Sequence, residues 1–337
     1  MTIGDVLCNN IIGLTAYTVT GKAIIAIDDK KTQLIGEYMK FTDLFGKATS
    51  SWIRYSGYDA KQDDNGEWFI LPSVDATPAV YDPIETAEQM VADALNIGLK
   101  IVMGDKQFYD DNRMAAEMCV FAEKYGLLGF MTGLPTTPEF MNYDMAYLPK
   151  NRHIRKESMP SKNFAKMFFP FDDRINENPN PNRRYVKDDG SIMVSLAVRN
   201  KPKAIEMTYQ RTYAEPANWM FTQFKDWFVT YYSVIAHNEE KDAREAEFYR
   251  ETLAAFDYAV PTFHLEMFDK IPVMVWDFPS LMQIIHLVFG LMITDEKQPL
   301  RSCKFCNRVF IAQHPKAEFC NHNCKNKFNV YKSRGRN

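Results

Sequence analysis

The sequence predicts an α+β protein in which a helix-rich body with short strands is followed by a small C-terminal module. Long apolar patterns with helical spacing occur in the second half of the chain, as in residues 281–293. Short apolar runs between polar turns, such as residues 67–73, have the length of strands. Four of the six cysteines lie between positions 303 and 324, among many basic residues. These three observations place the body in residues 1–299 and the C-terminal module in residues 300–337.

The first part of the body is expected to mix strands and helices. Residues 22–29 and 67–73 have the pattern of short strands. A helix is expected after Asp82, which can cap it, because Pro83 suits a first helical turn. A second helix is predicted over residues 111–125, ending at Gly126.

Residues 150–184 are interpreted as an exposed linker or long loop, because they are rich in Lys, Arg, Asn and Pro. This stretch is therefore a candidate break within the body. Its charges suit either a solvated surface or a secondary contact with nucleic acid.

The second part of the body is expected to be mainly helical. Two strands are predicted over residues 191–198 and 203–213. A long aromatic core helix is expected over about 216–236, and a charged amphipathic helix over 238–258. The nearly buried helix around 281–293 completes the body.

The charge of the chain is divided unevenly. Residues 301–337 hold nine Lys or Arg and one Glu, which gives them a net charge of +8. Because the whole chain has a net charge of −3, the preceding 300 residues carry −11. The first residues lack the basic segment of a secretory signal, and the run 281–293 is too short to span a bilayer. We therefore expect a cytoplasmic protein without a membrane partner, whose basic C-terminal module has a separate role.

The cysteine spacing predicts a metal site. Cys303 and Cys306 are separated by two residues, and Cys320 and Cys324 by three. In a reducing compartment such pairs hold metal more readily than they form disulfides, and Zn²⁺ takes four thiolates in a tetrahedron. The expected cofactor is structural zinc, because four cysteines leave no open coordination position.

The spacing also predicts a treble-clef-like zinc finger. Residues 307–320 are expected to form a β-hairpin, with a turn near residues 313–316. A helix starting near residue 319 or 320 would then present Cys320 and Cys324 one turn apart. His314 and His322 are alternative ligands.

The C-terminal module is also the expected nucleic-acid surface. Lys and Arg would contact phosphates, and Asn side chains could reach base edges if the helix enters a major groove. Duplex DNA is the favoured partner, and a solubilising tail is the alternative. The candidate contact residues are Arg308, Lys325, Asn326, Lys327, Asn329, Lys332, Arg334 and Arg336.

The module resembles the CGNR-type zinc finger that closes bacterial proteins of the ABATE kind. The matching residues include the four cysteines together with Phe310, Phe319, Asn326, Lys327 and Arg334. The motif Cys-Gly-Asn-Arg reads Cys324-Lys325-Asn326-Lys327 here, and the resemblance covers roughly 35 residues. It implies a bacterial DNA-binding transcription regulator whose N-terminal domain senses a ligand or a partner.

Two other functions remain open at this point. The module could pack on its own body or on an acidic protein without binding nucleic acid. Alternatively, the protein could bind RNA, through stacking on Phe328 or Tyr331, or be an enzyme with its site in the body. The chain has no Gly-rich phosphate loop, no G-x-S-x-G and no H-E-x-x-H motif, and the pair His264 and Glu266 fits strand packing better than catalysis, so we do not favour an enzyme.

Overall fold

The computed structural model describes ten ranges of the chain and a few single positions. They are residues 48–49, 52–103, 111–129, 145–147, 158–172, 211–239, 262–278, 280–295, 299–314 and 316–335, with positions 247, 248, 250, 251 and 253.

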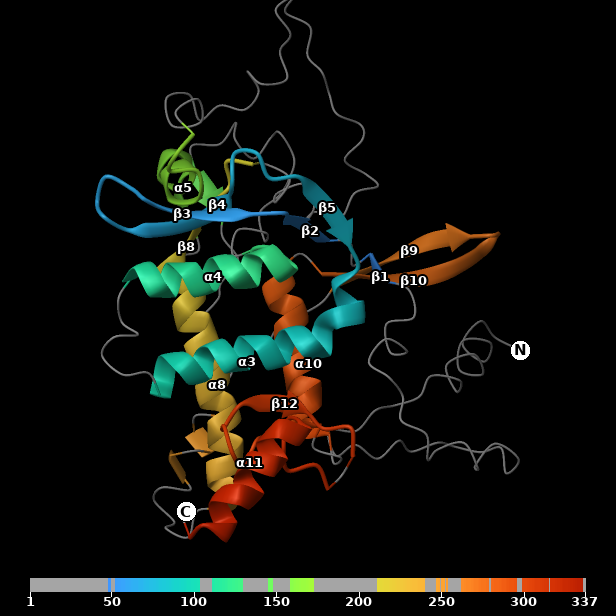
Figure 1. The fold of residues 1–337 in the computed structure, drawn as a ribbon. Coiled ribbons are helices and arrows are strands. Elements are labelled where there is room, and N and C mark those ends of the chain that lie inside the picture. The colour runs from blue at the N-terminus through green and yellow to red at the C-terminus, as the bar shows by residue number, and fades with distance from the viewer. Residues whose placement is uncertain are drawn as a thin grey trace, which may run out of the picture.

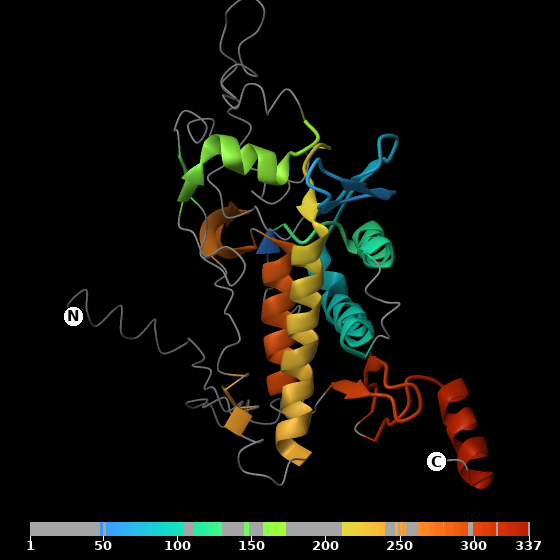
Figure 2. The same cartoon turned by 90° about the vertical axis from the view of Figure 1, so that its left-hand side faces the viewer.

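Four helices form two crossed layers at the centre of the body. Helices α3 (Ala87–Met103) and α4 (Asp111–Tyr125) lie across α8 (Ala217–Glu239) and α10 (Leu281–Thr294), as Figures 1 and 2 show from two sides. The predicted core helices are thereby confirmed. α8 and α10 are apolar over much of their surface because they are covered on more than one side.

The helix ends follow the capping signals in the sequence. Asp82 accepts a hydrogen bond from Ile84 N at the start of the 3₁₀ turn η2 (Pro83–Thr86), which leads into α3. Ser280 caps α10 through Gln283 N. α4 ends where Gly126 adopts a φ of +90°, a conformation that glycine tolerates and other residues rarely adopt.

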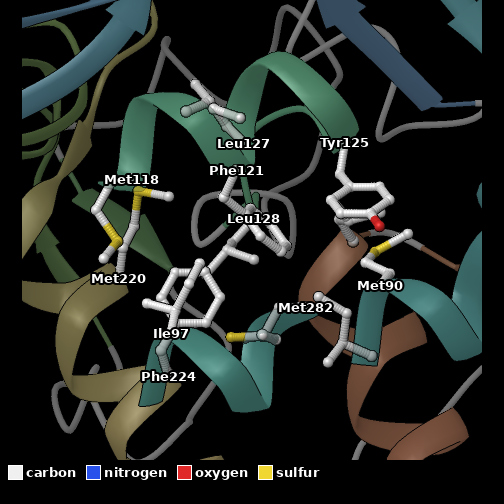
Figure 3. Packing of buried hydrophobic residues seen from close by; sticks show 14 of the residues in the cluster. Met90, Ile97, Met118, Phe121, Tyr125, Leu127, Leu128, Met220, Phe224 and Met282 are labelled. Atoms are coloured by element: carbon white, nitrogen blue, oxygen red, sulfur yellow. The ribbon is translucent and has the colours of Figure 1, made fainter. Parts of the chain in front are cut away.

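Side chains from all four helices meet in one core. Ile97, Phe121, Phe224 and Met282 come from α3, α4, α8 and α10, respectively, and all are buried (Figure 3). The rings of Phe121 and Phe224 lie edge to face with centroids 4.8 Å apart. Such aromatic pairs contribute roughly 0.5–1.5 kcal/mol beyond the area that they bury.

Small antiparallel sheets cover the outer side of α4 (Figure 1). One has the order β3-β4-β8, and the second pairs β2 with β5. Their strands are β2 (Trp52–Tyr55), β3 (Tyr58–Gln62), β4 (Trp68–Pro72), β5 (Pro78–Tyr81) and β8 (Glu215–Pro216).

A buried carboxylate fastens this sheet to the end of α4. Glu215 in β8 accepts hydrogen bonds from Leu128 N at 2.8 Å, from Gly129 N and from the Tyr213 hydroxyl. A buried carboxylate requires such donors because an unpaired charge is costly away from water.

A separate hairpin projects from the helical layers (Figure 1). It consists of β9 (Thr262–Phe268) and β10 (Ile271–Asp277), joined by a two-residue turn at Asp269 and Lys270. β1 (Ala48–Thr49) pairs with β10 in parallel at its base.

The prediction of an exposed linker is wrong for residues 158–172. β7 (Ser158–Pro160) pairs with β6 (Met145–Tyr147), and the helix α5 (Ser161–Phe168) follows. Phe168 and Phe169 are buried in the main core. The burial of these two rings explains why a helix forms where a linker was predicted. The Lys-rich sequence around them forms a short amphipathic helix.

Several predicted elements lie outside the described residues. These are the strands over 22–29 and 191–198, nearly all of the strand over 203–213, most of the helix over 238–258, and the remainder of the predicted linker. None of the helices in the described ranges combines the length and the apolar character that a membrane crossing requires.

The crossing of α3 and α8 depends on Gly98. An alanine Cβ there would lie 2.2 Å from the Phe224 carbonyl oxygen and 2.5 Å from Phe228 Cβ. We predict that Gly98→Ala lowers the free energy of unfolding by about 2–3 kcal/mol, because the backbone of α8 must move. Chemical denaturation monitored by circular dichroism would measure this loss.

Gly290→Ala in α10 is the control, because nothing lies within 4 Å of its added Cβ. It should leave stability unchanged or raise it by up to about 1 kcal/mol. Equal losses in the two variants would contradict close helix packing at Gly98.

Candidate metal centre

The first cysteine pair lies in the turn of a hairpin. β11 (Leu300–Ser302) pairs with β12 (Val309–Ile311), and residues 303–308 form the connection. Asn307 N donates to Cys303 O at 2.9 Å, and Asn307 takes a φ of +58°, which Asn tolerates better than most residues. In this turn the backbone N–H groups of Phe305 and Cys306 point toward Cys303.

This hairpin differs from the predicted one. β12 pairs with the strand before Cys303, whereas residues 312–314 and 316–321 contain bends and a turn but no strand. The prediction of a hairpin over residues 307–320 is therefore wrong. The pairing of β12 with β11 is favoured because it buries Leu300 and Val309 in the main core.

The second cysteine pair lies at the start of helix α11 (His322–Ser333). Asn321 caps this helix by accepting from Cys324 N at 2.8 Å, and its amide nitrogen lies 3.5 Å from Cys320 Sγ. Cys320 thus precedes the helix, and only Cys324 lies within it. The prediction that both belong to the helix is wrong, because the capping side chain stands between them.

The four sulfur atoms lie close together. All four are within 4.8 Å of one another. Cys306 Sγ is 3.7 Å from Cys320 Sγ, Cys320 Sγ is 3.5 Å from Cys324 Sγ, and Cys324 Sγ is 3.8 Å from Cys306 Sγ. No disulfide joins the described cysteines, which include these four.

These distances fit an ion with tetrahedral coordination. Four sulfurs at about 2.3 Å from a central ion would be separated by roughly 3.8 Å. A disulfide would instead require about 2.05 Å between two sulfurs. The cluster can therefore hold one metal ion with four sulfur ligands, whereas His314 and His322 are exposed and lie outside it.

The backbone around Cys303 favours the thiolate that a metal requires. Burial alone would raise the pKa of the Cys303 thiol, but hydrogen bonds from the backbone of Cys320, Cys306 and Phe305 lower it to about 6. Burial also raises the pKa of Cys320, and the neighbouring thiols raise it further. Cys303 is thus prepared to ionise ahead of Cys320.

Few apolar contacts support the module around this cluster. Phe319 packs on Phe328 with ring centroids 5.2 Å apart, and Phe305 stacks on Tyr331 at 5.7 Å. No residue of α11 is buried. The Lys304 ammonium, 2.5 Å from the Glu318 carboxylate, adds an exposed ion pair of the kind that contributes little.

A buried asparagine fastens the module to the body. Asn96 in α3 donates from Nδ2 to Val309 O and accepts at Oδ1 from Val309 N, both at 2.8 Å. The backbone N–H and C=O of Val309 in β12 are therefore both hydrogen-bonded to the Asn96 side chain. Sequence reasoning missed Asn96, although a lone Asn in the apolar helix ADALNIGLK is the kind of signal that could have revealed it.

The predicted nucleic-acid residues of α11 lie on its exposed side. At about 100° per residue, Lys325 and Lys332 lie along one edge of the helix, and Lys327 and Arg334 along the opposite edge. Asn326 and Asn329 lie between the edges, while Cys324, Phe328 and Tyr331 face the cysteine cluster. Figure 2 shows α11 standing apart from the helical layers.

Every described candidate contact residue is exposed, namely Lys325, Asn326, Lys327, Asn329, Lys332, Arg334 and also Arg308, which follows the first cysteine turn. Arg336 lies outside the described residues.

The histidines of the body show no catalytic arrangement within the described residues. His264 and Glu266 are both exposed on β9. His286 is buried in α10, where Gln223 Nε2 lies 3.1 Å from its Nε2. Gln223 thus gives this buried imidazole a polar partner.

Comparisons with protein-family models, with curated proteins and with solved structures find no match to this chain. The resemblance to the CGNR-type finger stays a prediction that rests on its residues alone.

The contact between Asn96 and Val309 generates a stability prediction. Asn96→Ala leaves a buried N–H and a buried C=O without partners, so we expect a loss of about 2–4 kcal/mol in the free energy of unfolding. Denaturation of the metal-loaded protein would measure it, and hydrogen exchange should show reduced protection of the Val309 amide.

Gln89→Ala on the same helix is the control. Gln89 makes an exposed hydrogen bond to Asp93, so its loss should change stability by less than about 0.5 kcal/mol. Unchanged protection of Val309 in Asn96→Ala would show that this side chain does not hold the module.

Proposed function

We propose that the four cysteines hold one structural zinc ion in a treble-clef-like finger, and that α11 of this finger binds duplex DNA. The protein would be a cytoplasmic transcription regulator, with the body sensing a ligand or a partner. The observation that carries the proposal is an exposed helix with two basic edges beside a cluster of four thiols.

Zinc is the ion that best suits this donor set. Four thiolates favour zinc over hard cations such as Mg²⁺ and Ca²⁺, and zinc accepts tetrahedral geometry without strain. The turn around Cys303 and the capped start of α11 would supply two ligands each. Such an ion would have a structural role only, because all four positions would be filled.

The arrangement of α11 suits a major groove. A helix with its side chains is about 10–12 Å wide, and the groove is about 12 Å wide. Lys325 and Lys332 could contact phosphates on one strand, while Lys327 and Arg334 contact the other. The polar strip between them would then bring Asn326 and Asn329 to base edges, where Asn can pair with adenine through two hydrogen bonds.

The charge distribution supports the same orientation. The acidic body would be repelled by phosphates, whereas the basic finger would be attracted to them. Because α11 points away from the body, this helix can approach DNA first.

The contacts of the finger bear on the two alternatives. Packing of β12 on α3 is what a self-packing module requires, yet α11 takes no part in it. Single-stranded RNA would need Phe328 or Tyr331 for stacking. Phe328 packs on Phe319, and Tyr331 stacks on Phe305 but stays 43% exposed. Comparison of duplex with single strands in the binding experiment therefore decides between the two.

Salt-dependent binding tests the proposal. The probe is a fluorescent duplex of mixed sequence, compared with single-stranded DNA and RNA, and titrated with zinc-loaded protein. Each neutralised phosphate contributes about −0.9 to the slope of log affinity against log salt. The variant Lys325→Ala, Lys327→Ala, Lys332→Ala should lose three phosphate contacts, so its slope should be less steep by about 2.7 and its affinity at low salt at least about tenfold weaker.

A control with the same change in charge is Lys61→Ala, Lys225→Ala, Lys270→Ala, three exposed lysines of the body. It should bind like the unchanged protein. Absence of duplex binding at low salt, or an equal loss in the control, would reject DNA binding by α11.

A further inference from the structure

The projecting hairpin has one entirely apolar face. Its register pairs Phe263 with Trp276, Leu265 with Met274, and Met267 with Pro272, and alternation places all six side chains on the same side. The rings of Phe263 and Trp276 lie 5.8 Å apart, edge to face. His264 and Glu266 belong to the opposite side, so no charged residue interrupts the apolar face.

Much of this face is exposed to solvent. The exposed fraction is 58% for Phe263, 72% for Leu265, 66% for Met267 and 45% for Met274. On the opposite side, Val275 is buried near the base of the hairpin. An uninterrupted apolar surface of this kind is often an interaction site.

We propose that this face binds the same face of a second copy of the chain, forming a two-fold symmetric dimer. A face without charges offers nothing to nucleic acid or to an acidic peptide, and a second copy supplies a matching apolar surface. The acidic bodies of two copies repel each other, so a projecting hairpin with one uncharged face is a suitable place for contact.

The available area fits a small dimer interface. The exposed fractions of these side chains correspond to roughly 500 Å² on each copy, so the contact would bury about 1,000 Å² in total, where specific interfaces begin. In a two-fold symmetric contact the same surface of both copies forms the interface. One apolar face on each chain is therefore enough to form a dimer. We therefore expect reversible association with a dissociation constant in the micromolar range, on the order of 1–100 µM.

Dimerisation does not depend on zinc or DNA binding, but it would give the assembly two α11 helices. Two reading helices joined by a symmetric contact would recognise a site with two related halves.

Sedimentation of the full-length, metal-loaded chain across about 1–100 µM tests the proposal. The expected result is a monomer–dimer equilibrium that Leu265→Glu, Met267→Glu weakens at least about tenfold. The matched control is His264→Glu, Ile271→Glu on the opposite face, where Ile271 is 65% exposed. It adds two acidic side chains to the same hairpin and should leave the equilibrium unchanged.

A monomer at every concentration would overturn the proposal, as would a dimer that both variants weaken equally or that neither weakens. Circular dichroism would check that the variants fold, and the milder Leu265→Ala provides a second test. A photo-crosslinking residue in place of Leu265 should join two chains. Crosslinks confined to one chain, for example to residues 1–47, would show that the protein covers this face itself.

Discussion

The C-terminal module depends on four thiols that meet at one point. Around these thiols, two aromatic pairs contribute roughly 0.5–1.5 kcal/mol each, and no residue of α11 is buried, although Leu300 and Val309 belong to the main core. Coordination of zinc by such ligand sets contributes about 10–16 kcal/mol in small peptides. The difference in magnitude means that the ion, rather than a core, would hold the cysteine turn against the start of α11.

A second constraint fixes the position of the module relative to the body. Leu300 and Val309 belong to the main core, and Asn96 satisfies both backbone groups of Val309. Because Asn96 lies only two residues from the Gly98 crossing, α3 connects the packing of α8 with the edge of β12. The direction in which α11 points is therefore set by the body, although α11 itself does not contact the main core.

Local signals predicted much of this structure, and long-range contacts account for what they missed. Asp82 marks the start of a helix through its side chain and Gly126 marks the end of another through its positive φ, and the cysteine spacing predicted the four thiols that meet in one cluster. The partner of β12 could not be predicted, because burial of Leu300 and Val309 against α3 selects it. α5 was missed for the same reason, since Phe168 and Phe169 gain their burial from distant residues.

X-ray absorption at the zinc edge of protein purified without added metal tests the central claim most directly. We expect one zinc per chain, surrounded by four sulfur atoms at about 2.3 Å, with no nitrogen or oxygen ligand. A shell containing imidazole nitrogen would place His314 or His322 in the site and contradict the four-cysteine assignment. Absence of bound zinc in a protein whose α11 is still folded would contradict the claim that the ion holds this module together.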